Sequence, residues 1–227
     1  MTLGRLEKWR PEEESEIAYY KRLLRKSPKQ YSLLDLLADA FFRQADYKEA
    51  IHCWQKFLRK RNVKDTFRIL MNIAQSYEHL GEIEHAYYYY GEAVKSNSRN
   101  LNALGKWGQM AYILENYEDA LTSFKQITKR ESYNEIGWHN LGLTQYNLGY
   151  QEEAIKCLET SLTFDDKSAD TWYTLATIYA ENYLLDDALF ALEQALTLDP
   201  ELKETARDEQ SFQSLMDLTL FRFFVEV

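Results

Sequence analysis

The side chains best able to do chemistry in this sequence are its histidines and cysteines. They are His52, His79, His85, His139, Cys53 and Cys157. A metal site or a catalytic pair would need such groups at short, regular spacings, as in His-x3-His. The sequence contains no such spacing, no glycine-rich phosphate loop and no Gly-x-Ser-x-Gly nucleophile elbow. We therefore expect a non-enzymatic protein with no metal ion and no other cofactor.

Two acidic pairs, Asp165-Asp166 and Asp186-Asp187, are the remaining candidates for acid–base chemistry. Both fall where helices are expected to start or where the chain turns. Carboxylates are favoured at these places because they cap helices and complement the helix dipole. We interpret both pairs as capping and turn residues.

The charge of the chain is unevenly distributed. Residues 1–64 hold 15 Lys and Arg against 9 Asp and Glu, whereas residues 65–227 hold 12 against 27, and the net charge is -9. An acidic body repels nucleic acid and anionic lipid and favours a basic partner. We expect the basic run Arg59-Lys60-Arg61 to be solvated charge at one end of the fold, not a nucleic-acid site.

The composition of the chain indicates its cellular compartment and its type of secondary structure. No apolar run approaches the roughly 20 residues that cross a bilayer, and the first residues carry no apolar signal-peptide core. The two cysteines are far apart, which suits free thiols in a reducing compartment. With 3 prolines and 8 glycines, the chain favours long helices. We expect a cytoplasmic, helical protein.

An alanine recurs at a regular interval along the chain. The five positions are Ala50, Ala86, Ala120, Ala154 and Ala188, with spacings of 36, 34, 34 and 34 residues. Another small residue, glycine or alanine, precedes each alanine by twelve positions: Ala38, Ala74, Gly108, Gly142 and Ala176. Large apolar residues recur around them at i, i+3, i+4 and i+7, the stripe of an amphipathic helix. The pattern predicts stacked helix hairpins that approach closely at the small residues.

In this register the sequence resembles the tetratricopeptide-repeat (TPR) family. The last repeat carries the motif most fully, with Trp172, Leu175, Ala176, Tyr179, Ala188, Leu192, Ala195 and Pro200. The resemblance covers five repeats, at residues 31–64, 67–100, 101–134, 135–168 and 169–202. It implies an all-α fold, a right-handed solenoid of antiparallel helix hairpins. Turns at Gly81 and Gly149 are expected to use the left-handed conformation that glycine allows.

Both ends of such an array need caps. Residues 1–30 are expected to form an arm and a capping helix over 11–27, with Pro11 at its first position. Residues 203–227 resemble the short tail that closes bacterial TPR arrays. This tail is expected to fold over the last hairpin. The alternative is that 219–227 docks on a neighbouring molecule and makes a homo-oligomer.

The resemblance implies that the first helix of each repeat lines a concave groove for a protein or peptide. The groove residues that we expect to bind the partner are Arg68, Asn72, Gln75, Asn102, Lys106, Gln109, Tyr112, His139, Asn140, Tyr146 and Tyr173. Asn147 and Glu181 occupy further groove positions. Amides and tyrosines there suit the backbone of an extended peptide.

The expected function is therefore that of a scaffold or adaptor for protein binding. The alternatives are self-assembly through the tail and an acidic TPR chaperone for secreted substrates. The carboxylate clamp of chaperone-binding TPRs is not expected, because Asp35 and Asp39 would repel a terminal carboxylate. In the run Tyr87–Tyr90, Tyr90 and Tyr87 are expected to face inward. Tyr88 and Tyr89 are expected to face the convex side or a neighbour, as a second contact site.

Overall fold

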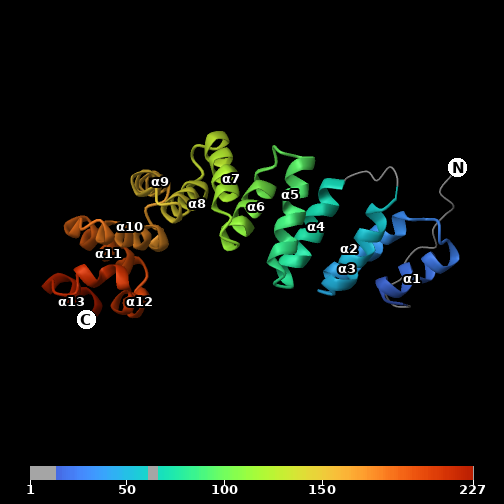
Figure 1. Cartoon of the computed structure of the whole chain (residues 1–227). Helices are drawn as coiled ribbons and strands as arrows, with labels where there is room; N and C mark the ends of the chain where they lie inside the picture. The colour runs from blue at the N-terminus through green and yellow to red at the C-terminus, as the bar shows by residue number, and fades with distance from the viewer. Residues whose placement is uncertain (1–13, 61–65, 227) are drawn as a thin grey trace. The chain divides into compact units, whose positions relative to one another are not determined.

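The computed structural model describes residues 14–60 and 66–226 (Figure 1). The α-helices within these ranges are α1 (Glu16–Lys26), α2 (Ser32–Arg43), α3 (Tyr47–Leu58), α4 (Thr66–His79), α5 (Ile83–Ser96), α6 (Leu101–Ile113), α7 (Tyr117–Arg130), α8 (Glu135–Asn147), α9 (Gln151–Phe164), α10 (Ala169–Glu181), α11 (Leu185–Leu198), α12 (Leu202–Asp208) and α13 (Thr219–Glu226). A short 3-10 helix, η1 (Gln210–Ser214), lies between α12 and α13. No strand occurs in the described ranges, so the expected all-α fold is confirmed.

The chain divides into two compact units, residues 1–110 and 111–227. In unit 1, α2 packs on α3 and α4 on α5, with α1 against α2. In unit 2, α8 packs on α9 and α10 on α11, and α7 lies against α8. Helix α6 crosses the boundary, so that its residues up to Met110 belong to unit 1 and its last turn to unit 2.

The recurring alanines lie in the tightest parts of the core. All five, from Ala50 to Ala188, are fully buried. A Cβ added to Gly142 of α8 would lie 2.7 Å from Leu158 Cγ and 3.2 Å from the Ala154 carbonyl oxygen of α9. Such contacts are closer than packed atoms tolerate, so the glycine allows α8 and α9 to approach. The expected role of these small residues is confirmed at this hairpin.

The turns inside the helix pairs repeat one backbone conformation. The described residues with positive φ are Ala45, Gly81, Glu115, Gly149 and Tyr183, with φ between 58° and 82°. After each, the next residue donates its N–H to a carbonyl five residues back, as from Glu82 to Tyr77 at 2.9 Å. This bond is the Schellman closure of a helix C-terminus. The expected left-handed glycines are confirmed, and three turns adopt the same conformation without glycine.

The first helix starts later than expected. The Ser15 hydroxyl accepts a hydrogen bond from the Ala18 N–H at 3.2 Å, and α1 begins at Glu16. Because a serine side chain can satisfy a free N–H of the first turn, it sets this start. The expected start at Pro11 was wrong, and Pro11 itself lies outside the described residues, as does Arg61. Tyr19 and Leu23 of α1 are buried in one cluster with Leu33 of α2.

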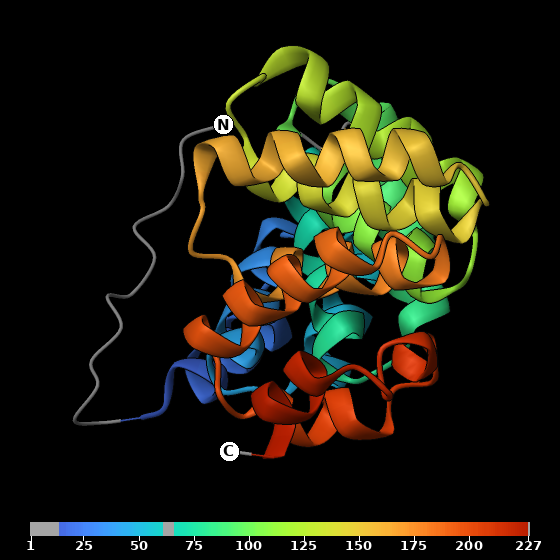
Figure 2. The same ribbon diagram turned by 90° about the vertical axis from the view of Figure 1, so that its left-hand side faces the viewer.

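The C-terminal tail packs on the last hairpin of unit 2. Phe212, Leu215, Phe221 and Val225 are buried in one cluster with Leu192 of α11. The Arg207 guanidinium Nε donates to the Val225 carbonyl at 2.6 Å and ties α12 to α13. The C-terminal helices, drawn in red in Figure 2, lie beside the orange helices α10 and α11. Leu220 and Phe223 on the other face of α13 are exposed to 57% and 61%. The apolar side chains of residues 219–225 are therefore divided between this core and the surface.

Candidate functional site

Polar side chains join the first helices of successive hairpins in both units. We call the polar faces of these helices the first-helix surfaces, one in each unit. In unit 1 the helices are α2, α4 and residues 101–110 of α6, and in unit 2 they are residues 111–113 of α6 with α8 and α10. The eleven residues expected from the sequence all lie on these helices. They fall into two groups, six in unit 1 and five in unit 2.

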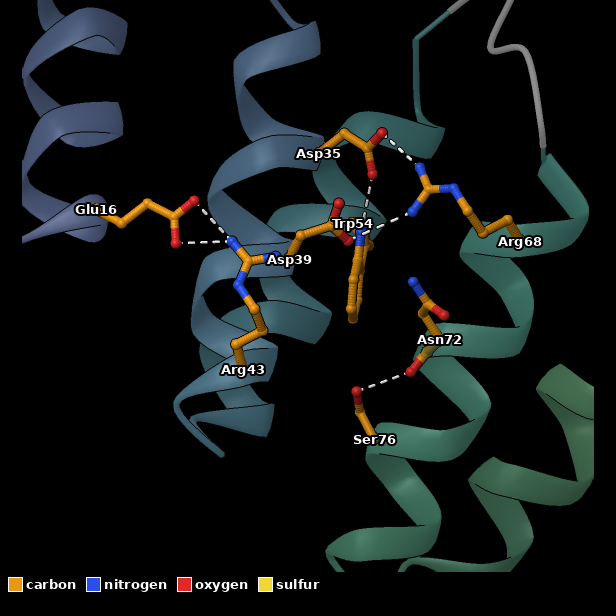
Figure 3. A network of polar contacts seen from close by, with 8 residues as sticks. All are labelled: Glu16, Asp35, Asp39, Arg43, Trp54, Arg68, Asn72 and Ser76. Atoms are coloured by element: carbon orange, nitrogen blue, oxygen red, sulfur yellow. Dashed lines mark hydrogen bonds and ion pairs between the residues drawn. The ribbon is translucent and has the colours of Figure 1, made fainter. Parts of the chain in front are cut away.

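In unit 1, Arg68 of α4 links two carboxylates of α2 (Figure 3). Its guanidinium lies 2.6 Å from Asp35 and 3.3 Å from Asp39. The Trp54 indole N–H donates to the other oxygen of Asp35 at 3.0 Å. Burial and then the Asp35 charge raise the pKa of the Asp39 carboxyl, and Arg68 opposes both effects. Arg68 thus offsets the repulsion between the two aspartates.

A second link joins α4 to α6 within unit 1. The Glu78 carboxylate accepts hydrogen bonds from the Lys106 ammonium at 2.7 Å and from the Tyr90 hydroxyl at 2.5 Å. Burial raises the pKa of Glu78, but these two donors outweigh it and the pKa is lowered overall. Lys106 is therefore held by its own unit. The same holds for Arg43, which bonds to Glu16 of α1 (Figure 3).

Four amide side chains of the unit 1 group make no side-chain hydrogen bond within the described part of the chain. They are Asn72, Gln75, Asn102 and Gln109. Gln75 and Asn102 are exposed, and the other two are half-buried. Each amide keeps one acceptor and two donor hydrogens. Their hydrogen-bonding capacity remains available to a partner.

In unit 2, two tyrosines connect consecutive first helices at the same repeat position. Tyr112 of α6 accepts a hydrogen bond from the Asn147 amide of α8 at 2.8 Å. Tyr146 of α8 donates to both carboxylate oxygens of Glu181 of α10, at 2.8 Å each. Both pairs are 35 residues apart in the sequence, one residue more than the repeat length. The repeat thus builds a two-rung polar ladder.

Further toward the N-terminal ends of α8 and α10, His139 contacts Thr171. Its Nδ1 lies 2.8 Å from the Thr171 hydroxyl, which is 2.7 Å from the Ser168 hydroxyl. Burial lowers the pKa of His139, partly opposed by Asp170, and favours the neutral ring. The neighbouring Asn140 donates its amide to Ile136 of its own helix at 2.9 Å.

Tyr173 of α10 lies beside the tail. Its ring packs edge-on against Phe212, with centroids 5.5 Å apart. Its hydroxyl is buried and has no hydrogen-bond partner among the described residues. Burial, and then the charge of Glu209, raise the pKa of Tyr173 to about 12.

The tail also shapes a pocket that the sequence did not predict. An open pocket of about 600 Å³ lies between the end of α10 and η1. Its lining residues are Ala180, Glu181, Tyr183, Glu209, Gln210, Ser211, Gln213 and Ser214. The sequence signal was the buried pair Phe212 and Leu215, whose spacing places η1 against α10. From its sequence alone, this segment is expected to be only an apolar cap.

The expected second surface at Tyr87–Tyr90 is mostly internal. Tyr90 is buried, and the Tyr89 hydroxyl accepts a hydrogen bond from Gln55 of α3 at 2.9 Å. Tyr87 stacks near Trp107, with centroids 6.2 Å apart. Tyr88 is 58% exposed and is the outward-facing member. Tyr89 faces a neighbour, because it joins α5 to the preceding hairpin, and this alternative of the expectation is confirmed.

The reactive groups named above are dispersed in the structure. No set of three or more His, Cys, Asp or Glu residues is arranged to hold a metal ion in the described ranges. Burial raises the pKa of both cysteine thiols to about 11. A search of the described residues also finds no helix with the length and apolar character that would span a bilayer.

Comparisons with known proteins agree with this geometry. A family model described as a tetratricopeptide repeat matches residues 137–168 and 169–202. These segments contain α8 with α9 and α10 with α11, the hairpins joined by the ladder. Residues 137–202 are tetratricopeptide repeats. A second model, a domain of unknown function (DUF6340), matches residues 37–123.

Solved TPR structures share this fold. YrrB, described as a TPR protein with an unusual peptide-binding site, superposes with a TM-score of 0.70 at 16% identity, over 84% of this chain and 98% of that chain. MamA gives a TM-score of 0.66 at 16% identity, over 74% and 97%. A MamA fragment from Desulfovibrio magneticus gives 0.64 at 16% identity, over 78% and 97%. No curated protein sequence matches this chain significantly. The TPR solenoid fold expected from the sequence is confirmed.

Proposed function

We propose that this TPR protein is a scaffold or adaptor that binds a segment of a partner protein on its first-helix surfaces. The observation that carries the proposal is the polar ladder of unit 2, Tyr112–Asn147 and Tyr146–Glu181. Bonds between successive helices hold these side chains in place before a partner arrives. Pre-ordered side chains lose less entropy on binding, which favours recognition of a flexible segment.

The unpaired amides of unit 1 supply the complementary property. Asn72 and Gln75 of α4, with Asn102 and Gln109 of α6, offer donors and acceptors that an extended backbone can use. YrrB, which shares the fold, is described as having a peptide-binding site, and this description supports the same class of ligand here. The excess of Asp and Glu over Lys and Arg favours a basic segment.

Selection from a peptide library tests the proposal. Peptides displayed on phage are enriched on the full chain, and their Kd values are measured by fluorescence anisotropy. We expect the triple variant Asn72→Ala, Gln75→Ala, Asn102→Ala, or the variant Asn140→Ala with Tyr112→Ala, to weaken binding about tenfold or more.

The matched control removes amides from second helices. Gln151→Ala in α9 with Gln194→Ala in α11 should change Kd less than about twofold. Circular dichroism confirms that each variant is folded. If no peptide is enriched, or if neither surface variant changes Kd, the proposed function is wrong.

A second candidate function is self-association through α13. Leu220 and Phe223 of α13 and Phe190 of α11, which is 56% exposed, are large exposed apolar side chains of unit 2. Exposed apolar groups of this size favour contact with another molecule. The test of this candidate is given in the Discussion.

A further inference from the structure

The pocket between α10 and η1 has carboxylates but no basic side chain. Its lining contains Glu181 and Glu209, and none of its lining residues is Lys or Arg. Neither glutamate forms an ion pair within the described part of the chain. At about 600 Å³ the pocket falls in the size range of sites that take a ligand group.

Hydrogen bonds hold the Glu181 carboxylate in position but do not use all of its acceptor positions. Its carboxylate accepts the Tyr146 hydroxyl at 2.8 Å and the Ser211 hydroxyl at 2.9 Å. A carboxylate offers about four acceptor positions, so part of its capacity remains free. Two neutral donors orient the carboxylate without neutralising its charge.

Glu209 is fixed at the other side of the pocket. Its side chain accepts the Ser211 backbone N–H at 3.3 Å and caps η1. Its charge is close enough to raise the pKa of Tyr173, after burial. The buried Tyr173 hydroxyl has no hydrogen-bond partner in the described ranges. The negative charges of Glu181 and Glu209 therefore lie on the same pocket at the end of α10.

We propose that this pocket receives a basic side chain, arginine or lysine, of the partner segment, with Glu181 and Glu209 as its counter-ions. This inference rests on the proposed function and specifies the partner's chemistry. The surrounding unit supports it by charge, since residues 111–227 carry 22 Asp and Glu against 8 Lys and Arg. A guanidinium presents a planar fork of donors that matches a carboxylate, and an ammonium supplies the same charge as a point.

The test uses small probes, so it does not depend on finding the natural partner. N-acetyl-arginine methylamide, its lysine counterpart and the neutral isostere N-acetyl-citrulline methylamide are titrated into isotope-labelled full chain. We expect the two cationic probes to shift the backbone amide signals of Glu181, Ser211 and Gln213. Citrulline should bind at least about fivefold more weakly.

Variants separate the pocket from the general negative charge of the unit. Glu181→Gln and Glu209→Gln, each checked for folding by its spectrum, should each weaken the cationic probes about threefold or more. Asp186→Asn, an exposed carboxylate of α11 outside the pocket lining, should not. Equal shifts from citrulline, shifts located elsewhere, or no effect of either glutamine variant would overturn the assignment.

The two proposals fail in different ways. If library peptides bind on a first-helix surface but show no basic residue and no dependence on Glu181, the pocket assignment fails and the proposed function stands. If cationic probes bind in the pocket but no peptide is enriched, the proposed function fails.

Discussion

The Tyr146 hydroxyl donates to the Glu181 carboxylate 35 residues further along the chain, and the Asn147 amide reaches Tyr112 over the same interval. Each bond joins one first helix to the next. Because the repeat brings equivalent positions together, a side chain at one position can bond to a side chain of the neighbouring repeat. This relationship makes the polar face of unit 2 a structural element, and we propose that the same face binds the partner.

Removing the Tyr146 hydroxyl should weaken unit 2. Tyr146→Phe keeps the ring and removes one O–H donor to Glu181. We expect the free energy of unfolding to fall by about 1 kcal/mol, the usual value for one such bond. Urea unfolding followed by circular dichroism measures it. Tyr150→Phe is the control, because Tyr150 is 52% exposed and its hydroxyl makes no hydrogen bond within the described ranges. An equal effect of both variants would contradict the account.

Alkaline pH should destabilise the fold through its tyrosines. Burial, and then Glu78 or Glu181, raise the pKa values of Tyr90 and Tyr146, and burial followed by Glu209 raises that of Tyr173 to about 12. A raised folded-state pKa means that the stabilisation is complete below the unfolded value, about 10, and is lost as the pH rises through the folded value. The urea concentration at the midpoint of unfolding should therefore decrease as the pH rises above about 10. A flat profile up to pH 11.5 would contradict this expectation.

Arg68 should stabilise unit 1, because its positive charge offsets the repulsion between Asp35 and Asp39. In Arg68→Gln, Asp35 and Asp39 lose their shared cation, and we expect a loss of about 1 kcal/mol, since the arginine is partly exposed. The loss should shrink below about pH 4, where free aspartates take up protons. Urea unfolding at pH 7 and pH 3.5 tests both points. Arg99→Gln, an exposed arginine, serves as the control and should leave stability unchanged at both pH values.

The left-handed turns should respond in opposite directions to glycine and alanine. Glu115 has φ 59°, a conformation that costs a non-glycine residue about 1 kcal/mol. Glu115→Gly should therefore raise stability. Gly149→Ala, at φ 82°, should lower it by about 1 kcal/mol. Thermal unfolding measures both, and a fall in Tm for Glu115→Gly would show that its side chain stabilises the turn by more than its backbone strains it.

Substitutions on the exposed face of α13 test whether this helix mediates self-association. If Leu220 and Phe223 mediate contact between copies, Phe223→Ser should convert an oligomer into a monomer without changing the unfolding midpoint. Light scattering coupled to size exclusion measures the mass. Phe221→Ser is the contrasting variant, because Phe221 is buried and its loss should unfold the tail instead. A wild-type chain that is monomeric at high concentration would exclude this function.

Much of the fold could be predicted because it depends on residue size at fixed intervals. Ala154 and Gly142 are small where two helices meet, and Gly81 is a glycine where the backbone needs positive φ. Glu115 and Tyr183 adopt the same conformation, although their residue types do not indicate it. The surrounding helices impose it, and this constraint is invisible in local sequence.

The candidate site was less predictable, because it depends on which side chains reach one another. The sequence placed Arg68 and Asp35 on the first helices, but it could not show that they pair. From the sequence alone, Asp35 and Asp39 are expected to repel a terminal carboxylate, whereas in the structure Arg68 bonds to both. The pocket beside Glu181 depends on how the tail packs, and a stretch of apolar residues fixes burial but not the direction of a 3-10 helix.

The most direct test of the central claim is to locate a bound peptide on the protein. A library-selected peptide carrying a photo-reactive group is cross-linked to the full chain, and the attachment sites are identified by mass spectrometry. The account predicts attachment to first helices, namely α2, α4, α6, α8 or α10. Attachment confined to the second helices α5, α7, α9 and α11 would contradict it.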